Sequence, residues 1–414
     1  MIRIVHIEDS TKFPIIRTGI STDCDSVVAP IITAVRSERD TALLHYARQL
    51  DGLGAQPLAV PESELAEADK TLSPQFRRAV QTAIHNIRQF AQAQLPSERW
   101  EDFGPGRRLG WIVRPLDAVG CYVPSGRYPL PSTLLMTAVL AQVAGVRRIC
   151  ICSPKPSVEI LGCIHILGIR ELYRVGGAQA IAAMAFGTAS IIRVDRIVGP
   201  GNAYVAAAKK LLAGEVGIDF IAGPTEIMIL AAEGDPRLIA ADMLAQAEHD
   251  SLASAILITT SERLARAVAA EIEAQLATLP TACVAREAID SSSAILVVPE
   301  MRTGVALSNL YAPEHLSLHD PALLPEITNA GTVFLGPMSP ESAGDYAAGP
   351  SHVLPTAGVA RLRGGLSTAD FVKVIAIQQL SPSALDELAP TITTLARAEG
   401  LEGHARAVEV RSVR

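Results

Sequence analysis

The stretch RICICSPKPSVEILGCIHILGIRELYRV, residues 148–175, decides the fold class of this chain. A short apolar run at 148–152 is followed by a Ser- and Pro-containing break, a helical pattern at 157–167 and a second short run at 171–175. A strand, a helix and another strand in this order indicate two parallel strands joined by a crossover helix. The same alternation extends from this stretch in both directions.

The alternation occurs twice, over residues 116–225 and 226–335, on either side of the junction GIDFIAGPTE at 217–226. It predicts an α/β chain with parallel sheets that carry helices on both faces. The strands are expected at 118–123, 148–152, 171–175, 196–198, 227–230, 255–259 and 294–298. The helices are expected near 132–145, 157–167, 178–186, 202–213, 235–249 and 261–278.

The flanking segments follow a different pattern. Apolar residues recur at helical spacing through 27–94 and again through 383–399, and the chain ends in a strand-like run at 407–410. We therefore expect four parts in chain order. They are a mostly helical N-terminal region (1–115), a first sheet domain (116–225), a second sheet domain (226–365) and a C-terminal tail (366–414).

Composition excludes several classes of protein. The 414 residues are 49% hydrophobic and carry a net charge of −7, which argues against a nucleic-acid binder that needs a basic surface. The longest apolar stretch, 134–146, is too short to cross a bilayer, and the start MIRIVHIEDSTKF lacks the apolar core of a signal peptide. The six cysteines form no C-x-x-C pair, so we interpret them as reduced thiols of a cytoplasmic protein.

Several polar residues stand out against this background, and each allows two interpretations. Gln246 and His249 share one side of the helix predicted at 235–249; they are either two metal ligands or a core glutamine and a helix-end histidine. Glu314 and His315 are adjacent in a predicted loop after a strand; they are either an acid–base pair or part of a helix cap. The Gly-rich segment 340–356 is expected to be a loop that brings Asp345 near a ligand.

Two further groups of residues also allow either a functional or a purely structural interpretation when taken alone. Glu399 and His404 flank Gly400, which would otherwise be an ordinary helix C-cap. Glycine-rich turns at 122–133, 175–180, 198–204 and 222–226 are each expected to follow a strand and precede a helix, where α/β sheets bind ligands. None of these turns matches G-x-G-x-x-G, so the usual dinucleotide fingerprint is absent.

Taken together, these motifs resemble the histidinol dehydrogenase family. The resemblance begins at RDTALLHYARQLD (39–51) and is densest between 116 and 410. It is carried by VGGAQAIAA (175–183), VDRIVGPGNAYVAAAKK (194–210), IDFIAGPTE (218–226), AQAEHD (245–250), APEHL (312–316), GDYAAGPSHVLPT (344–356) and EGLEGHARAV (399–408).

The resemblance implies two Rossmann-like domains, one Zn²⁺ per subunit and two NAD reduced as L-histidinol is oxidised through its aldehyde to L-histidine. The zinc positions of the family match Gln246, His249, Asp345 and His404. Its acid–base pair matches Glu314, which would activate water, and His315, which would remove the alcohol proton.

The remaining positions of the family also find matches in this sequence. Its other substrate contacts match Thr225, His352 and Glu399, and its NAD contacts match Tyr122, Gln179 and Asn202. The resemblance further implies a homodimer in which the tail, with Glu399 and His404, enters the partner's active site.

Three departures from the family pattern leave other substrates open. Ser125 replaces a usual Gly, Ala369 replaces a common Tyr, and the segment 153–169 is short. One alternative is a paralogue that oxidises another polar alcohol, such as sulfopropanediol; Glu399 beside His404 argues against a sulfonate. A second is a zinc hydrolase, which the absence of H-E-x-x-H disfavours. A third is a catalytically silent binding protein.

Overall fold

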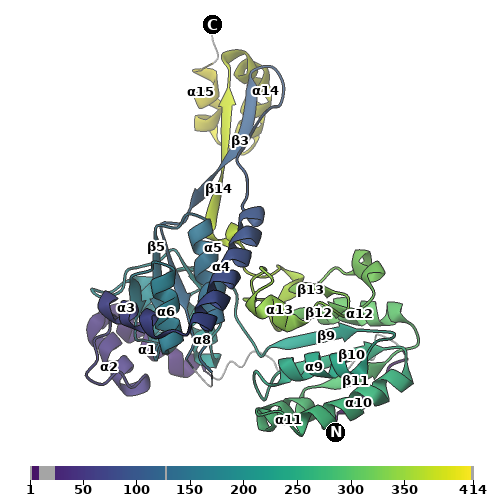
Figure 1. Ribbon diagram of the computed structural model, residues 1–414. Coiled ribbons are helices and arrows are strands. Elements are labelled where there is room, and N and C mark those ends of the chain that lie inside the picture. Colours follow the sequence, from purple (N-terminus) through teal and green to yellow (C-terminus); the bar gives the residue numbers. More distant parts are fainter. Residues whose placement is uncertain (1, 9–23, 126–127, 412–414) are drawn as a thin grey trace.

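The computed structural model describes residues 2–8, 24–125 and 128–411. Two lobes, each built around a parallel sheet, lie side by side, and a narrow arm projects from the first lobe (Figure 1). The predicted α/β fold with parallel sheets is confirmed. Within the described ranges, no helix combines the length and the apolar character needed to cross a membrane.

The first lobe contains a five-stranded parallel sheet in the order β6-β5-β4-β7-β8. Its strands are β4 (Ala118–Tyr122), β5 (Arg148–Cys152), β6 (Glu171–Tyr173), β7 (Arg196–Val198) and β8 (Gly217–Ile218). The crossover helices are α5 (Pro131–Val143), α6 (Val158–Ile166), α7 (Gly177–Phe186) and α8 (Ala203–Leu212). Strand β4 is buried along its whole length because helices cover both faces of the sheet.

The expected N-terminal helices complete this lobe. They are α1 (Asp25–Glu38), α2 (Asp40–Leu50), α3 (Glu62–Thr71) and α4 (Pro74–Gln94). Apolar residues of α3 and α4 share a core with α5 and α6, whereas those of α1 and α2 share a second core with α7 and α8. Each pair therefore adds an outer layer to one face of the sheet.

The second lobe contains a six-stranded parallel sheet in the order β1-β11-β10-β9-β12-β13. Its strands are β1 (Arg3–His6), β9 (Glu226–Leu230), β10 (Ser254–Thr259), β11 (Ala294–Val297), β12 (His315–Leu318) and β13 (Thr332–Leu335). Its helices are α9 (Pro236–Ala247), α10 (Glu262–Leu276), α11 (Ala282–Ser291), α12 (Met301–Tyr311) and α13 (Glu341–Tyr346), with a 3₁₀ turn η2 (Pro321–Glu326). Strand β1, from the start of the chain, forms one edge of this sheet.

The arm is a three-stranded antiparallel sheet in the order β14-β3-β2, capped by two helices. Its elements are β2 (Arg99–Asp102), β3 (Arg107–Pro115), β14 (Val372–Leu380), α14 (Pro382–Ala398) and α15 (Glu402–Glu409); the 3₁₀ turns η3 (Val359–Arg361) and η4 (Thr368–Phe371) precede β14. The sequence patterns did not predict this sheet, because its strands alternate between exposed and half-buried residues rather than forming apolar runs.

One expectation about the arm is wrong. The run at 407–410 alternates like a strand, but it belongs to helix α15 and the turn after it. Gly400, with a φ of +77°, ends α14 and reverses the chain. Arg397 then forms ion pairs with Glu402 and Glu409, which hold α15 against α14.

Candidate active site

The predicted acid–base pair lies at the amino end of strand β12, beside the amino end of the neighbouring strand β9. Glu314 precedes β12 and His315 is its first residue, so the expected loop after a strand is wrong. Likewise, the turn at 222–226 leads into strand β9 instead of a helix. Strands β9 and β12 pair in parallel with His315 opposite Ile227, which places Thr225 and Glu314 at the same edge.

Glu314 is buried and held by two hydrogen bonds. The Thr225 hydroxyl donates to its Oε2 at 2.6 Å, and the Glu226 amide donates to the same atom at 3.0 Å. Burial raises the pKa of Glu314 well above its usual value, although both hydrogen bonds act to lower it. A nearby positive charge would therefore favour the carboxylate form that a general base requires.

His315 presents a neutral imidazole with one free nitrogen. Its Nδ1 lies 3.2 Å from the carbonyl oxygen of Glu226, which can only accept, so Nδ1 carries the proton. The other nitrogen, Nε2, is buried and has no hydrogen-bond partner among the described residues. Burial lowers the pKa of His315 to about 3, and its ring stacks on Phe334. The Nε2 lone pair is therefore available to accept a proton.

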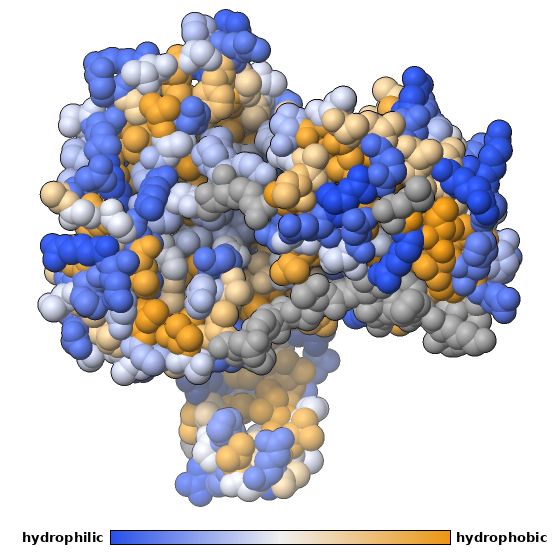
Figure 2. All heavy atoms as spheres, turned by 90° about the horizontal axis from the view of Figure 1, so that it is seen from below, coloured by the Kyte–Doolittle hydropathy of each residue, from blue (hydrophilic) through white to orange (hydrophobic). Residues whose placement is uncertain are grey.

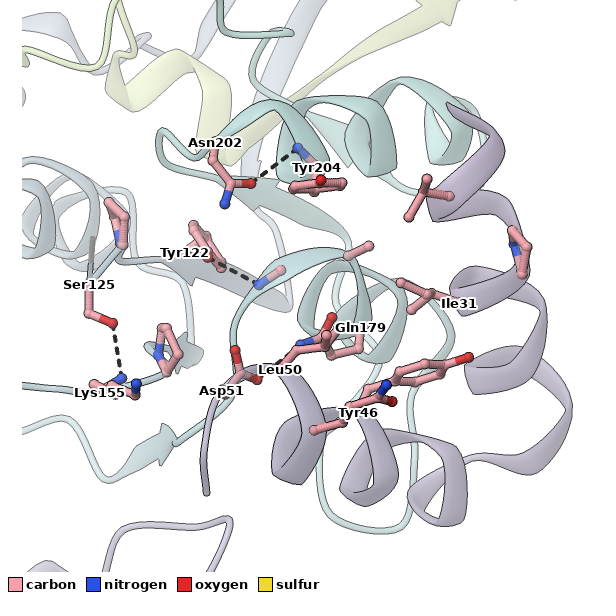
Figure 3. A pocket seen from close by; sticks show the side chains of 17 residues that line it. Ile31, Tyr46, Leu50, Asp51, Tyr122, Ser125, Lys155, Gln179, Asn202 and Tyr204 are labelled. Atoms are coloured by element: carbon pink, nitrogen blue, oxygen red, sulfur yellow. Dashed lines mark hydrogen bonds between the residues drawn. The ribbon is translucent and has the colours of Figure 1, made fainter. Parts of the chain in front are cut away.

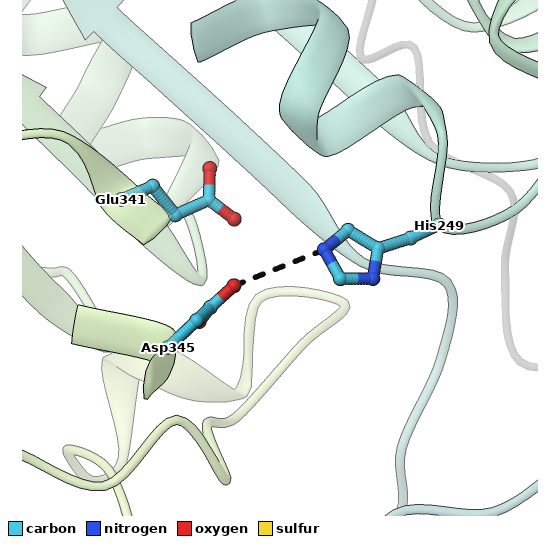
Figure 4. Close-up of side chains that lie close together, drawn as sticks. All are labelled: His249, Glu341 and Asp345. Carbon is cyan, nitrogen blue, oxygen red and sulfur yellow. Dashed lines mark ion pairs between the residues drawn. The ribbon is translucent and has the colours of Figure 1, made fainter. Parts of the chain in front are cut away.

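A potential metal-binding group lies beside this pair. His249, Glu341 and Asp345 bring one ligand atom each to within 4.8 Å of one another (Figure 4). His249 follows α9, and its Nε2 is 3.8 Å from Oδ2 of Asp345. The segment predicted as a loop at 340–356 contains helix α13, which places Glu341 and Asp345 one turn apart on the same side.

Gln246 lies next to this group in the last turn of α9 and is fully buried. With its amide nitrogen turned toward Glu341, it donates to Oε1 at 2.7 Å and Oε2 at 2.9 Å. Its oxygen then lies 2.6 Å from the Thr225 hydroxyl, whose single proton can serve either Gln246 or Glu314. Three of the four expected metal positions are thus adjacent.

The residues present suit a divalent cation such as Zn²⁺. Imidazole nitrogen and carboxylate or amide oxygen are ligands that Zn²⁺ takes without redox change. Burial raises the pKa of Asp345 to about 6 and that of Glu341 well above its usual value. Without a metal the two carboxylates repel each other when ionised, and a bound cation would relieve this repulsion.

Two expected site residues lie elsewhere in the single chain. His404 is in α15, and Glu399 is the residue that follows α14, so both belong to the tip of the arm (Figure 1). Glu341, by contrast, was not among the sequence candidates. Its position four residues before Asp345 would have suggested it only if α13 had been predicted as a helix.

His352 connects the metal-binding group to the first lobe. Its Nδ1 is 2.9 Å from the backbone oxygen of Asp345, and its Nε2 is 3.2 Å from the Thr133 hydroxyl on α5. Burial lowers the pKa of His352 to about 4, so the ring is neutral near pH 7. The side chain therefore spans the boundary between the two lobes at the edge of the site.

A cavity of about 710 Å³ opens in the first lobe, and all three expected NAD contacts line it (Figure 3). Tyr122 ends β4, Gln179 lies in the first turn of α7, and Asn202 caps α8. Because β4, β6 and β7 are parallel, the turns that follow them meet at one edge of the sheet, as expected. The cavity is large enough for part of a dinucleotide.

Asp51, which sequence analysis did not single out, also lines this cavity. Its Oδ2 accepts hydrogen bonds from the Gly176 amide at 3.0 Å and from Nε2 of Gln179 at 2.9 Å. Burial raises the pKa of Asp51. The residue directly follows α2, so no local pattern indicates that it reaches the turn before α7.

A nucleotide-sized cavity on one Rossmann-like sheet and a histidine–carboxylate site on the other are the features of a two-domain α/β dehydrogenase. Comparison with known proteins agrees. The family model described as histidinol dehydrogenase matches residues 17–412. Histidinol dehydrogenase from Thermus thermophilus is 47% identical, covering 99% of this chain and 100% of its own length. The enzyme from Syntrophotalea carbinolica is 46% identical, with 94% and 92% covered.

Solved structures give the same result. The crystal structure of histidinol dehydrogenase from Elizabethkingia anophelis superposes with a TM-score of 0.95 at 35% identity, covering 99% of this chain and 98% of that one. An acetylating aldehyde dehydrogenase from Geobacillus thermoglucosidasius, at a TM-score of 0.50 and 10% identity, shares features of the fold alone. The chain belongs to the histidinol dehydrogenase family, a family of NAD-dependent oxidoreductases.

Proposed function

We propose that this chain oxidises L-histidinol to L-histidine through L-histidinaldehyde, with zinc in the second lobe and two NAD reduced in succession in the first. Family membership supports the substrate. The observation that carries the chemistry is the free, buried Nε2 of His315 beside the His249–Glu341–Asp345 group. A base and a substrate anchor are thus adjacent.

In the first step, His315 accepts the alcohol proton at Nε2 while the substrate carbon loses a hydride to the nicotinamide. The Glu226 carbonyl holds the Nδ1 proton, so the tautomer is set before substrate binds. The zinc, when bound, supplies positive charge that anchors the imidazole and amine of the substrate. Orientation of this kind places the carbinol carbon near the base and the cofactor.

In the second step, Glu314 takes a proton from the water that adds to the aldehyde. The resulting hydrate gives up its hydride to a second NAD, and the carboxylate of histidine forms. Glu314 must be ionised for this role, although burial raises its pKa. The zinc charge and the Thr225 and Glu226 donors favour the ionised form. Thr225, bonded to Glu314, and His352, bonded to the Asp345 backbone, are the further substrate contacts that we propose.

We further propose a homodimer in which Glu399 and His404 complete the partner's site. Of the four expected ligands, Gln246, His249 and Asp345 lie close to one another in one chain, whereas His404 stands at the end of a projecting arm. Exposed apolar side chains on the arm favour contact with another surface (Figure 2). They include Trp100, Phe103, Val374, Ile375 and Leu401. All six cysteines are free, which is in keeping with the proposed cytoplasmic location.

The test follows NADH absorbance after addition of L-histidinol to the purified protein, with and without a chelator. We expect two NADH per histidinol, and loss of turnover on chelation that added Zn²⁺ restores. Activity on another polar alcohol but not on histidinol would identify a paralogue. NADH formation that is unaffected when the metal content falls to zero would contradict the zinc assignment.

A further inference from the structure

We propose that a buried ion pair, Lys209 with Asp219, positions the turn at 198–202 and thereby sets the affinity for NAD. The inference rests on the proposed function, because it assigns the turn to the cofactor. Lys209 lies on α8 and Asp219 directly after β8, both outside the cavity lining. They are therefore positioning residues rather than cofactor contacts.

The two side chains are removed from solvent and paired closely. Nζ of Lys209 is 2.7 Å from Oδ1 of Asp219, and the side chains are 2% and 0% exposed. A buried lysine is rare, and burying two charges costs free energy that their attraction only partly returns. A protein with an apolar pair of the same volume at these positions would often be as stable. We therefore infer that the ion pair serves to position the backbone around it rather than to stabilise the fold.

That geometry concerns Gly199, the residue that the pair holds from both sides. Lys209 donates to the Gly199 carbonyl at 2.5 Å, and the Gly199 amide donates to Oδ2 of Asp219 at 2.8 Å. Both backbone polar groups of one residue are thus bound to one ion pair. The Phe220 amide donates to Oδ1 of Asp219 at 2.7 Å, which fixes the carboxylate itself.

Gly199 in turn packs directly against the backbone at the end of β4. Its φ is +108°, and a Cβ there would lie 2.2 Å from the backbone oxygen of Tyr122. Three residues later, Asn202 caps α8 and lines the cavity. The ion pair therefore fixes the separation between two of the proposed NAD contacts, Tyr122 and Asn202, without touching the cofactor.

The test is the double variant Lys209→Met/Asp219→Asn, which removes both charges and so leaves no unpaired buried ion. The matched control is Lys210→Met/Asp25→Asn, because Lys210 is the next residue on α8 and its pair with Asp25, also at 2.7 Å, is partly exposed. NAD affinity is measured by calorimetric titration of the metal-loaded protein without histidinol. Steady-state constants, zinc content and the melting temperature are measured in parallel.

We expect the double variant to bind NAD about tenfold or more weakly, as loss of about two hydrogen bonds to the turn predicts. Its kcat at saturating NAD, its KM for histidinol and its zinc content should stay within about twofold of wild type. A merely structural role would lower the active fraction, and hence kcat, without raising the KM for NAD. The control should match wild type in every respect.

Equal NAD affinity in wild type and a folded double variant would overturn the proposal, as would an equal loss in the control. If the double variant does not fold, Lys209→Arg decides, because it keeps the buried charges balanced and changes only the donor geometry at the Gly199 carbonyl; we expect an intermediate rise in the dissociation constant for NAD. Unchanged NAD binding in that variant also overturns the proposal. A wild-type protein that binds no NAD would instead overturn the proposed function.

Discussion

At the residue scale, the chemistry depends on which nitrogen of His315 is free. The Glu226 carbonyl fixes Nδ1, and Nε2 faces the space beside Asp345, whose Oδ1 is 4.0 Å away. Glu314, its neighbour in sequence, points to Thr225 instead. Both side chains bond to the Glu226 backbone, and Oε2 of Glu314 is 3.6 Å from Nδ1 of His315. The Nε2 that can accept a proton is the other ring nitrogen, which suits two different proton transfers.

We therefore predict separate defects in the two oxidation steps. His315→Ala should slow oxidation of histidinol, and Glu314→Gln should chiefly slow oxidation of histidinaldehyde, because only that step consumes water. Losses of roughly 10²–10⁴-fold are typical of a removed general base. Stopped-flow NADH formation from each substrate measures the two steps separately. Equal losses on both substrates in both variants would rule out the division of roles.

The carboxylates predict a pH effect on the metal-free protein. The pKa of Asp345 is about 6 in the folded chain, whereas that of an Asp in an unfolded chain is about 3.9, so the folded state binds the proton more tightly. Its contribution to stability is present below about pH 3.9 and is lost as pH rises through 6, about 3 kcal/mol in all.

The measurement is the free energy of unfolding of chelator-treated protein between pH 4 and 7. Asp345→Asn should lose this part of the pH dependence and become more stable than wild type near pH 7. Zinc should stabilise wild type far more than the variant. If the free energy of unfolding depends on pH in the same way in wild type and Asp345→Asn, the pKa of Asp345 is not raised as its burial indicates.

Single residues were the hardest features to predict from local pattern. Gln246 and His249 each had an ordinary structural reading, and only their order among seven motifs gave them a metal role. Glu341 was missed because Gly344 and Gly349 make the surrounding segment look like a loop. Asp51 was missed because its partners, Gly176 and Gln179, lie more than a hundred residues away.

At the element scale, helix α13 presents two carboxylates to the metal group, and they should differ in role. Asp345→Ala removes an expected ligand and should abolish stoichiometric zinc. Glu341→Gln keeps the volume but weakens the hold on the Gln246 amide, so zinc affinity should fall about 10–100-fold. Zinc content after dialysis against graded chelator measures both. Wild-type zinc affinity in Glu341→Gln would exclude this supporting role.

Helix α8 gives a second test at this scale. The Asn202 oxygen accepts from the Tyr204 and Val205 amides, and its amide nitrogen points toward the cavity (Figure 3). Asn202→Ser keeps an acceptor for the cap and loses the donor, so NAD affinity should fall with little loss of stability. Asn202→Ala should lose both the helix-capping acceptor and the donor to NAD, so it should also lower the free energy of unfolding by about 1 kcal/mol.

Calorimetric NAD titration and thermal unfolding separate these two effects. Zinc content should be unchanged in both variants, since the turn lies in the first lobe. A zinc-depleted Asn202 variant would mean that this turn serves the metal site instead.

Elements in the two parallel sheets were predictable because both faces are covered and the strands are continuous apolar runs. Strand β12 was missed because His315 and Ser317 interrupt its apolar residues, and β13 was missed because it is a half-buried edge strand. The arm was missed for another reason. Strands β3 and β14 have few buried residues in the single chain, so their sequence carries no pattern of a sheet facing a core.

At the scale of the whole molecule, the arm separates residues that the chemistry needs together. His404 in α15 and Glu399 after α14 lie at its tip, whereas His249 follows α9 and Asp345 lies in α13, both elements of the second lobe (Figure 1). A two-fold dimer can bring the tip of one chain to the site of the other. The central claim is that each active site is built from two chains.

Complementation tests this claim most directly. His249→Ala and His404→Ala, each inactive alone, are co-expressed with different tags, and the mixed dimers are purified through both. One site of a mixed dimer then carries both lesions and the other carries neither, so histidinol-dependent NADH formation should return to about half of wild type per dimer. Mixed dimers that are no more active than the single variants would show that each site comes from one chain.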